Sequence, residues 1–185
     1  MSEIIVVTGL PRSGTSLMMQ VLNQAQVPIL QDGVRESDIS NPQGYYELED
    51  VKNIVADNSF LDHAGGKAVK IVAPLPIYAK PELKYKMVFM RRDIQEILQS
   101  QEKMLLKDQT SEREKFRTIY EFHLKKTYRF LKENNIPFID INYNELMANP
   151  LKSMQQVIEF LGLSSSPEQL AGVVNPELYR NRNEG

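Results

Sequence analysis

Short apolar runs alternate with longer amphipathic segments along most of the chain. Four of these runs are EIIVVTG (3–9), which is continuous and β-branched, KAVKIVA (67–73), YKMVFM (85–90) and IPFIDINY (136–143). The first run, which ends at a glycine, is typical of a strand buried on both faces of a parallel sheet, and the other three also predict strands. Helical spacing of apolar positions predicts helices over 15–25, from about Tyr46, over 93–107, over 111–133 and over 150–163. This alternation predicts an α/β fold with a central, mainly parallel sheet flanked by helices.

Length and composition narrow the class of protein. A chain of 185 residues without an internal repeat predicts one domain over residues 1–185. The net charge of -2 disfavours a dedicated nucleic-acid binder, which usually carries a basic excess. The chain has no cysteine and two distant histidines, His63 and His123, so we expect no metal site. Neither a membrane-spanning run nor a basic leader region precedes or interrupts these segments, and we expect a cytoplasmic protein without membrane insertion.

The first strand is followed by a loop that has the outline of a phosphate-binding loop. Its sequence, GLPRSGTS (9–16), keeps both glycines and the final hydroxyl of G-x-x-x-x-G-K-[ST], but Thr15 occupies the lysine position. Backbone N–H groups of such a loop, together with a helix N-terminus, converge on an anion. The cation that spans the β- and γ-phosphates of a nucleoside triphosphate is missing, and Arg12 offers a planar, oxyanion-binding charge instead.

This loop resembles the 5′-phosphosulfate loop of sulfotransferases, enzymes that use 3′-phosphoadenosine 5′-phosphosulfate (PAPS) as donor. The arginine form of the loop is similar to that of protein-tyrosine sulfotransferases and bacterial relatives. The resemblance implies a three-layer P-loop fold and metal-free transfer of a sulfuryl group. It also implies that the donor's 5′ end is bound by the loop residues Arg12, Ser13, Gly14, Thr15 and Ser16.

The segment VFMRRDIQEILQSQ resembles the family's 3′-phosphate signature, an arginine at a strand end followed eight residues later by a serine. In this register the pair is Arg92 and Ser100, with Ile94 in place of the usual proline. Asp93 is placed to cap the following helix, with Glu96 three residues on. Arg91 is the alternative arginine, and strand alternation puts it on the opposite face. Further along, INYNELMANP and FLGL resemble family segments that serve packing.

The resemblance leaves the catalytic base open. Lys70 aligns with a family lysine that lies near the donor's bridging oxygen, but Val72 stands where cytosolic relatives carry a histidine base. Other relatives use an acid in the segment after the first helix. There Asp32, with Arg35 three residues on, fits best, and Asp38, Glu36 and Glu47 are the alternatives. The C-terminal Arg180 and Arg182 lack the family's context and are expected to be solvated.

Two other functions compete with a sulfotransferase that acts on an unidentified small-molecule, carbohydrate or peptide acceptor. A small-molecule or nucleotide kinase needs the Walker lysine and an acid that holds Mg²⁺, and Thr15 argues against it. A non-catalytic nucleotide-binding relative is the other alternative, since it needs the anion loops but no base.

Overall fold

A computed structural model describes residues 2–34, 44–106 and 108–175. Within them a four-stranded sheet has the order β2-β1-β3-β4, and every neighbouring pair is parallel. The strands are β1 (Ile4–Gly9), β2 (Ala68–Lys70), β3 (Tyr85–Arg91) and β4 (Phe138–Asn142). The predicted α/β fold with a parallel central sheet is confirmed.

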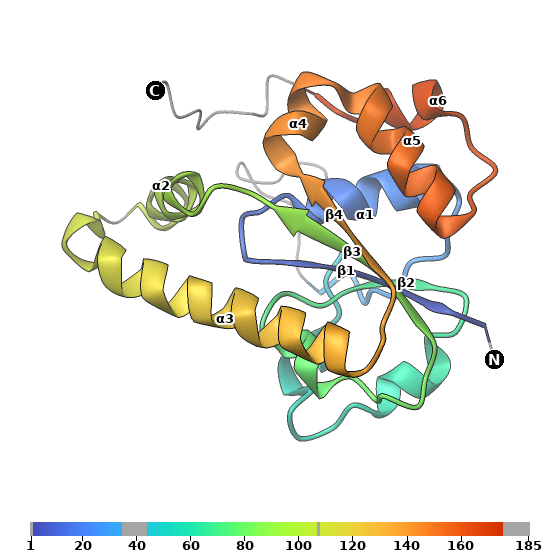
Figure 1. The fold of residues 1–185 in the computed structure, drawn as a ribbon, viewed down its shortest axis with the longest axis horizontal. Coiled ribbons are helices and arrows are strands. Elements are labelled where there is room, and N and C mark those ends of the chain that lie inside the picture. Colours follow the sequence, from blue (N-terminus) through green and yellow to red (C-terminus); the bar gives the residue numbers. More distant parts are fainter. Residues whose placement is uncertain (1, 35–43, 107, 176–185) are drawn as a thin grey trace.

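Helices cover both faces of this sheet, so the molecule has three layers (Figure 1). One face carries α1 (Thr15–Gln24), α4 (Tyr143–Ala148), α5 (Pro150–Leu161) and α6 (Pro167–Ala171). The other face carries α3 (Arg113–Glu133) and three 3₁₀ turns, Glu49–Asn53, Ser59–His63 and Leu75–Tyr78. The remaining elements are α2 (Ile94–Leu105) and a 3₁₀ turn, Thr110–Glu112.

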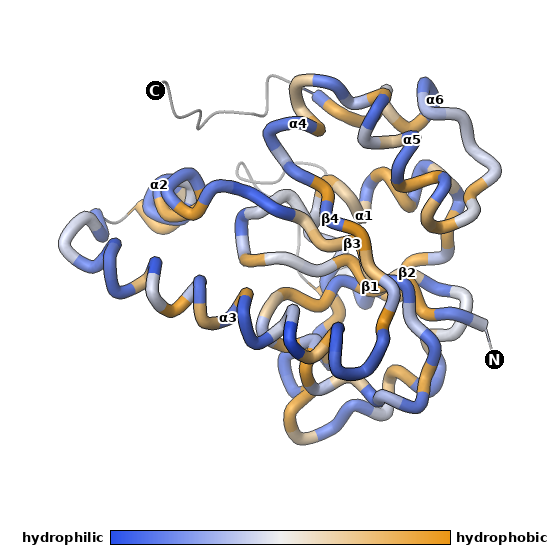
Figure 2. Tube along the Cα trace, viewed as in Figure 1, coloured by the Kyte–Doolittle hydropathy of each residue, from blue (hydrophilic) through white to orange (hydrophobic). Residues whose placement is uncertain are grey.

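The apolar core is divided by the sheet, because successive strand residues point to opposite faces. Val7, Val88 and Ile141 pack with α1, α4, α5 and α6, whereas Val6 and Phe89 pack with α3 and the 3₁₀ turns. Figure 2 shows the strands as a largely hydrophobic centre and α3 as a helix of alternating hydrophilic and hydrophobic positions. The apolar runs therefore correspond to strands: β1, β2 and β3 are largely buried on both sides, whereas the edge strand β4 exposes Asp140 and Asn142.

One predicted element is wrong. The helix expected from about Tyr46 is absent: no regular structure is assigned to residues 44–48, and a 3₁₀ turn follows at Glu49–Asn53. Tyr46 has a φ of 51°, outside the α-helical region, so an α-helix cannot run through it. Tertiary contacts of this segment, described below, override its helical pattern.

No helix within residues 2–34, 44–106 and 108–175 is long and apolar enough to cross a membrane.

Candidate active site

The candidate site lies at the edge of the sheet where all four parallel strands have their carboxyl ends. β1 ends at Gly9, β2 at Lys70, β3 at Arg91 and β4 at Asn142. Ligands of open α/β sheets bind outside this edge, because the loops that leave the strands gather there. The topology thus brings together segments that are as far apart in the sequence as Gly9 and Asn142.

The glycine-bearing loop is a tight turn with three residues in left-handed backbone conformations. Gly9, Arg12 and Gly14 have φ values of 142°, 67° and 99°. At Gly9 a Cβ atom would lie 2.5 Å from the carbonyl oxygen of Met90, so the loop can leave the sheet this closely only with glycine. Ser13 closes the turn, since both its N–H and its hydroxyl donate to the carbonyl oxygen of Leu10, at 3.2 and 2.7 Å. Its side chain is therefore used within the loop.

Helix α1 begins directly after this loop. Its N-cap is Gly14, which has no side chain to make a capping hydrogen bond, and the first turn of the helix contains no acidic residue. The N–H groups of a first helical turn have no partners within the helix and carry the positive end of its dipole. Thr15 is buried and Ser16 is partly exposed at this end. The loop and helix thus have the features of an anion site.

Arg12 links the loop to helix α2. Its Nε donates to the hydroxyl of Ser100 at 3.1 Å, and its Nη1 lies 3.6 Å from the Sδ atom of Met104. Ser100 is 4% exposed. The two segments that the sequence singled out as separate anion sites are therefore in direct contact.

Arg92 adds a second link between these segments. Its Nη1 donates to the backbone carbonyl of Arg12 at 3.1 Å, and its Nε donates to Glu96 at 3.0 Å. Its guanidinium lies 4.5 Å from the centre of the Tyr143 ring. The side chains of Arg92 and Glu96 are 6% and 2% exposed, which makes them a buried ion pair. These contacts hold the guanidinium against the backbone of the glycine-bearing loop.

The role of Glu96 as a partner of Arg92 was missed by the sequence reasoning. Its backbone N–H donates to the carboxylate of the expected cap, Asp93, at 3.2 Å. Its own carboxylate binds Arg92 and also accepts a hydrogen bond from the side-chain amide of Asn144 at 2.9 Å. The i, i+4 spacing of Arg92 and Glu96 is the signal in the sequence that could have revealed this ion pair.

Arg91 points away from this cluster. Its Nη1 donates to the hydroxyl of Tyr128 on α3 at 2.9 Å, and its guanidinium lies 5.4 Å from the centre of the Tyr128 ring. Tyr128 also donates to Asp140, and burial raises its pKa. Arg91, the last residue of β3, and Arg92, directly after it, therefore point to opposite sides, as the alternation along a strand predicts.

Lys70 ends β2 and is almost completely buried. Its Nζ donates to the backbone carbonyl of Tyr45 and to a carboxylate oxygen of Glu47, the latter at 3.0 Å. The side chains of Lys70 and Glu47 are 5% and 24% exposed. Of the acids named from the sequence, Glu47 is thus the one that the described structure joins to Lys70.

Asp32 is placed differently. It is exposed, and its carboxylate accepts hydrogen bonds from the backbone N–H groups of Val34 (2.9 Å) and Glu49. These bonds, that of Glu49 first, lower the pKa of Asp32. These hydrogen bonds make the carboxylate a weaker base.

The remaining candidates fall into two groups. His63 ends a 3₁₀ turn, and His123 lies within α3, where burial lowers its pKa. Arg35, Glu36, Asp38, Arg180 and Arg182 lie outside the described residues. Among the described residues, no three His, Asp or Glu side chains are arranged to hold a metal ion.

Comparison with known proteins identifies the family. The model of the sulfotransferase domain matches residues 2–176. The chain belongs to the sulfotransferase family. It is therefore a member of an enzymatic family, and the interpretation drawn from the loop is confirmed at this level.

Solved sulfotransferase structures share the fold. Sulfotransferase STF9 from Mycobacterium avium has a TM-score of 0.55 at 14% identity, and the match covers 98% of this chain and 69% of STF9. The sulfotransferase domain of the Synechococcus PCC 7002 olefin synthase has a TM-score of 0.53 at 12% identity, with 98% and 83% covered. A comparison with curated proteins found no match. At sequence identities this low, the two matches show a shared fold.

Proposed function

We propose that this sulfotransferase uses PAPS as its donor and holds the two ends of the nucleotide at the two linked segments. Arg12 and residues 13–16 bind the 5′-phosphosulfate, while Arg92 and Ser100 bind the 3′-phosphate. The observation that carries this proposal is the contact between the segments: Arg12 reaches Ser100, and Arg92 reaches the backbone of Arg12. One nucleotide with two anionic groups fits such a joined pair of sites better than a single triphosphate does.

The proposed reaction moves an SO₃ group without a metal. An oxygen of the acceptor attacks sulfur, the bond between sulfur and the bridging phosphate oxygen breaks, and its electron pair stays on adenosine 3′,5′-bisphosphate. Negative charge develops on that leaving oxygen. Arg12 and Lys70 are the cations proposed to stabilise it, since fixed charges in a site from which water is excluded act most strongly on such a group.

The acceptor proton needs a base, and we assign this role to Glu47. Its carboxylate lies 3.0 Å from Lys70 and is partly exposed, so an acceptor hydroxyl has access to it. Asp32 is less suitable, because backbone N–H groups occupy its carboxylate and lower its pKa. Asp38 stays a rival, since it falls in the same segment of the sequence.

Ligand binding tests the donor. Calorimetry with adenosine 3′,5′-bisphosphate in EDTA is expected to show binding that Mg²⁺ does not strengthen. ATP with Mg²⁺ is expected to bind much more weakly, because Thr15 replaces the lysine that spans its β- and γ-phosphates. Binding of ATP that requires Mg²⁺, without binding of the bisphosphate, would favour the kinase instead.

Turnover tests the base and separates an enzyme from a non-catalytic relative. Transfer of labelled sulfate from PAPS to a panel of acceptors is measured for wild type, Glu47→Gln, Asp32→Asn and Asp38→Asn. Loss of a general base typically lowers kcat by about 10²–10⁴-fold, and we expect this for Glu47→Gln alone. Asp32→Asn is the matched control and should remain within about three-fold of wild type. A large loss in Asp38→Asn with an active Glu47→Gln would assign the base to Asp38.

A further inference from the structure

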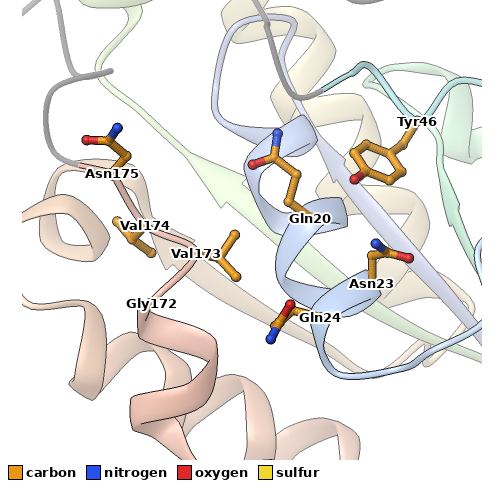
Figure 3. Close-up of a pocket in the computed structure, with 8 residues that line it drawn as sticks. All are labelled: Gln20, Asn23, Gln24, Tyr46, Gly172, Val173, Val174 and Asn175. Atoms are coloured by element: carbon orange, nitrogen blue, oxygen red, sulfur yellow. The ribbon is translucent and has the colours of Figure 1, made fainter.

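A polar cleft of about 540 Å³ lies beside α1, on the side of the segment that follows α6 (Figure 3). Three amide side chains of α1, the ring of Tyr46 and the chain from Gly172 to Asn175 line it. The amides belong to Gln20, Asn23 and Gln24, whose i, i+3, i+4 spacing puts them on neighbouring turns of one helix face. None of these parts has a role in the donor site proposed above.

The lining of this cleft has a definite chemistry. Each amide offers two N–H donors and a carbonyl acceptor, so the three together can both donate to and accept from hydroxyl groups. Tyr46, Val173 and Val174 add apolar surface for the C–H faces of a ligand. No side chain that lines the described cleft is charged. Such a surface matches a neutral molecule with many hydroxyl groups.

The cleft is joined to the candidate site through three consecutive residues. The backbone carbonyl of Tyr45 and the carboxylate of Glu47 both accept hydrogen bonds from Lys70, while Tyr46 between them lines the cleft. Tyr46 has a φ of 51°, which turns the chain sharply at this point. Because consecutive Cα atoms are about 3.8 Å apart, a ligand on the Tyr46 ring lies close to the backbone that carries Glu47.

We propose that this cleft binds the acceptor and that the acceptor is a neutral carbohydrate. The inference rests on the function proposed above. One sugar hydroxyl gives its proton to Glu47 and its oxygen attacks sulfur, while further hydroxyls bind the amides of α1. A tyrosine in an acidic peptide would require basic side chains in the cleft, and a simple phenol would require a mainly apolar pocket.

The test combines an acceptor panel with variants of the cleft. Neutral oligosaccharides such as maltose and cellobiose are compared with 4-nitrophenol and with a tyrosine peptide rich in Asp and Glu, using labelled PAPS. Asn23→Ala, Gln24→Ala and the double variant remove two exposed amides, and folding should survive because neither belongs to the core. Gln155→Ala on α5 removes an exposed amide that binds Glu159 and is the matched control.

We expect sulfation of a neutral oligosaccharide, with KM raised about 10-fold or more in the double variant and kcat little changed. This pattern is that of binding lost equally from ground and transition states, at roughly the strength of two hydrogen bonds. Bisphosphate affinity should be unchanged in every cleft variant. Sulfation of the phenol or peptide alone, no sulfation of any carbohydrate despite bisphosphate binding, or an unchanged KM in the double variant would each overturn the inference. Absence of bisphosphate binding in wild type would instead refute the proposed donor.

Discussion

Replacement of Arg92 by alanine should have two separable effects, one on folding and one on donor binding. The guanidinium is 6% exposed and pairs with Glu96, which is 2% exposed. Its loss leaves the Glu96 carboxylate buried without its cation. It also removes the hydrogen bond to the backbone carbonyl of Arg12 and the charge proposed to hold the 3′-phosphate.

The magnitudes follow from these contacts. Removal of one partner of a buried ion pair typically costs about 3–5 kcal/mol of folding free energy. Hydrogen bonds to a charged group are worth about 1.5–3 kcal/mol, which corresponds to roughly 10- to 150-fold in dissociation constant. We therefore expect Arg92→Ala to be much less stable than wild type and, where folded, to bind adenosine 3′,5′-bisphosphate at least 10-fold more weakly.

A double variant separates the two effects. In Arg92→Ala/Glu96→Gln the buried side chain is neutral, so much of the lost stability should return. The affinity should stay low, because no cation has been restored. Urea unfolding gives the free energy of unfolding, and calorimetry at low temperature gives the dissociation constant for the folded fraction.

Arg91→Ala is the control, since Arg91 is the neighbouring arginine and binds Tyr128 on the opposite face. Its affinity for the bisphosphate should remain within about three-fold of wild type, because most substitutions away from a site change free energies by less than about 0.5 kcal/mol. Equal losses of affinity in Arg91→Ala and Arg92→Ala, or recovered affinity in the double variant, would show that the wrong arginine has been assigned.

Two further predictions concern the loop and the segment after α1. Gly14→Ala places a Cβ atom 2.5 Å from Cδ2 of Tyr143 at a φ of 99°, and strain and overpacking together should cost about 2–6 kcal/mol. At Gly162 the φ is 72° and no atom lies within 4 Å of an added Cβ, so Gly162→Ala should lower the free energy of unfolding by only about 1–2 kcal/mol. Urea unfolding measures both variants, and equal losses would contradict the predicted clash at Gly14. Backbone hydrogen bonds lower the pKa of folded Asp32, so its contribution to stability is present above its unfolded pKa of about 3.9 and is lost as the pH falls through the lower, folded value. Asp32→Asn should therefore be less stable than wild type at pH 7, with the difference shrinking below about pH 3.9, and a gap that is constant with pH would refute this.

Much of the fold could be predicted because its signals are local. Four apolar runs indicate the strands, and the glycines of the loop mark the turn from β1 into α1. The assignment of Arg92 to one face and Arg91 to the other followed from strand alternation alone. The bound positions of PAPS at these residues stay predictions.

The parts that could not be predicted depend on contacts between distant segments. The segment from about Tyr46 has a helical pattern, yet the carbonyl of Tyr45 and the carboxylate of Glu47 accept hydrogen bonds from Lys70, more than 20 residues away. Asp32 was preferred as base from a short pattern, and its backbone hydrogen bond from Glu49 is equally non-local. Nothing in the spacing of these residues specifies which acid meets the lysine, because the sheet decides which segments become neighbours.

The parallel register of the sheet has a mechanical consequence for the bound donor. The residues proposed to hold it follow β1, end β2 and extend from β3, so a single nucleotide would brace three adjacent strands at one edge. The bound nucleotide would restrain local opening at the carboxyl ends of these strands. Amide hydrogen exchange should accordingly slow most at the last residues of β1, β2 and β3 when the bisphosphate binds. The amino ends of the same strands, including Ile4 and Tyr85, should exchange almost as before, and the sheet would be stiffened from its carboxyl edge inward.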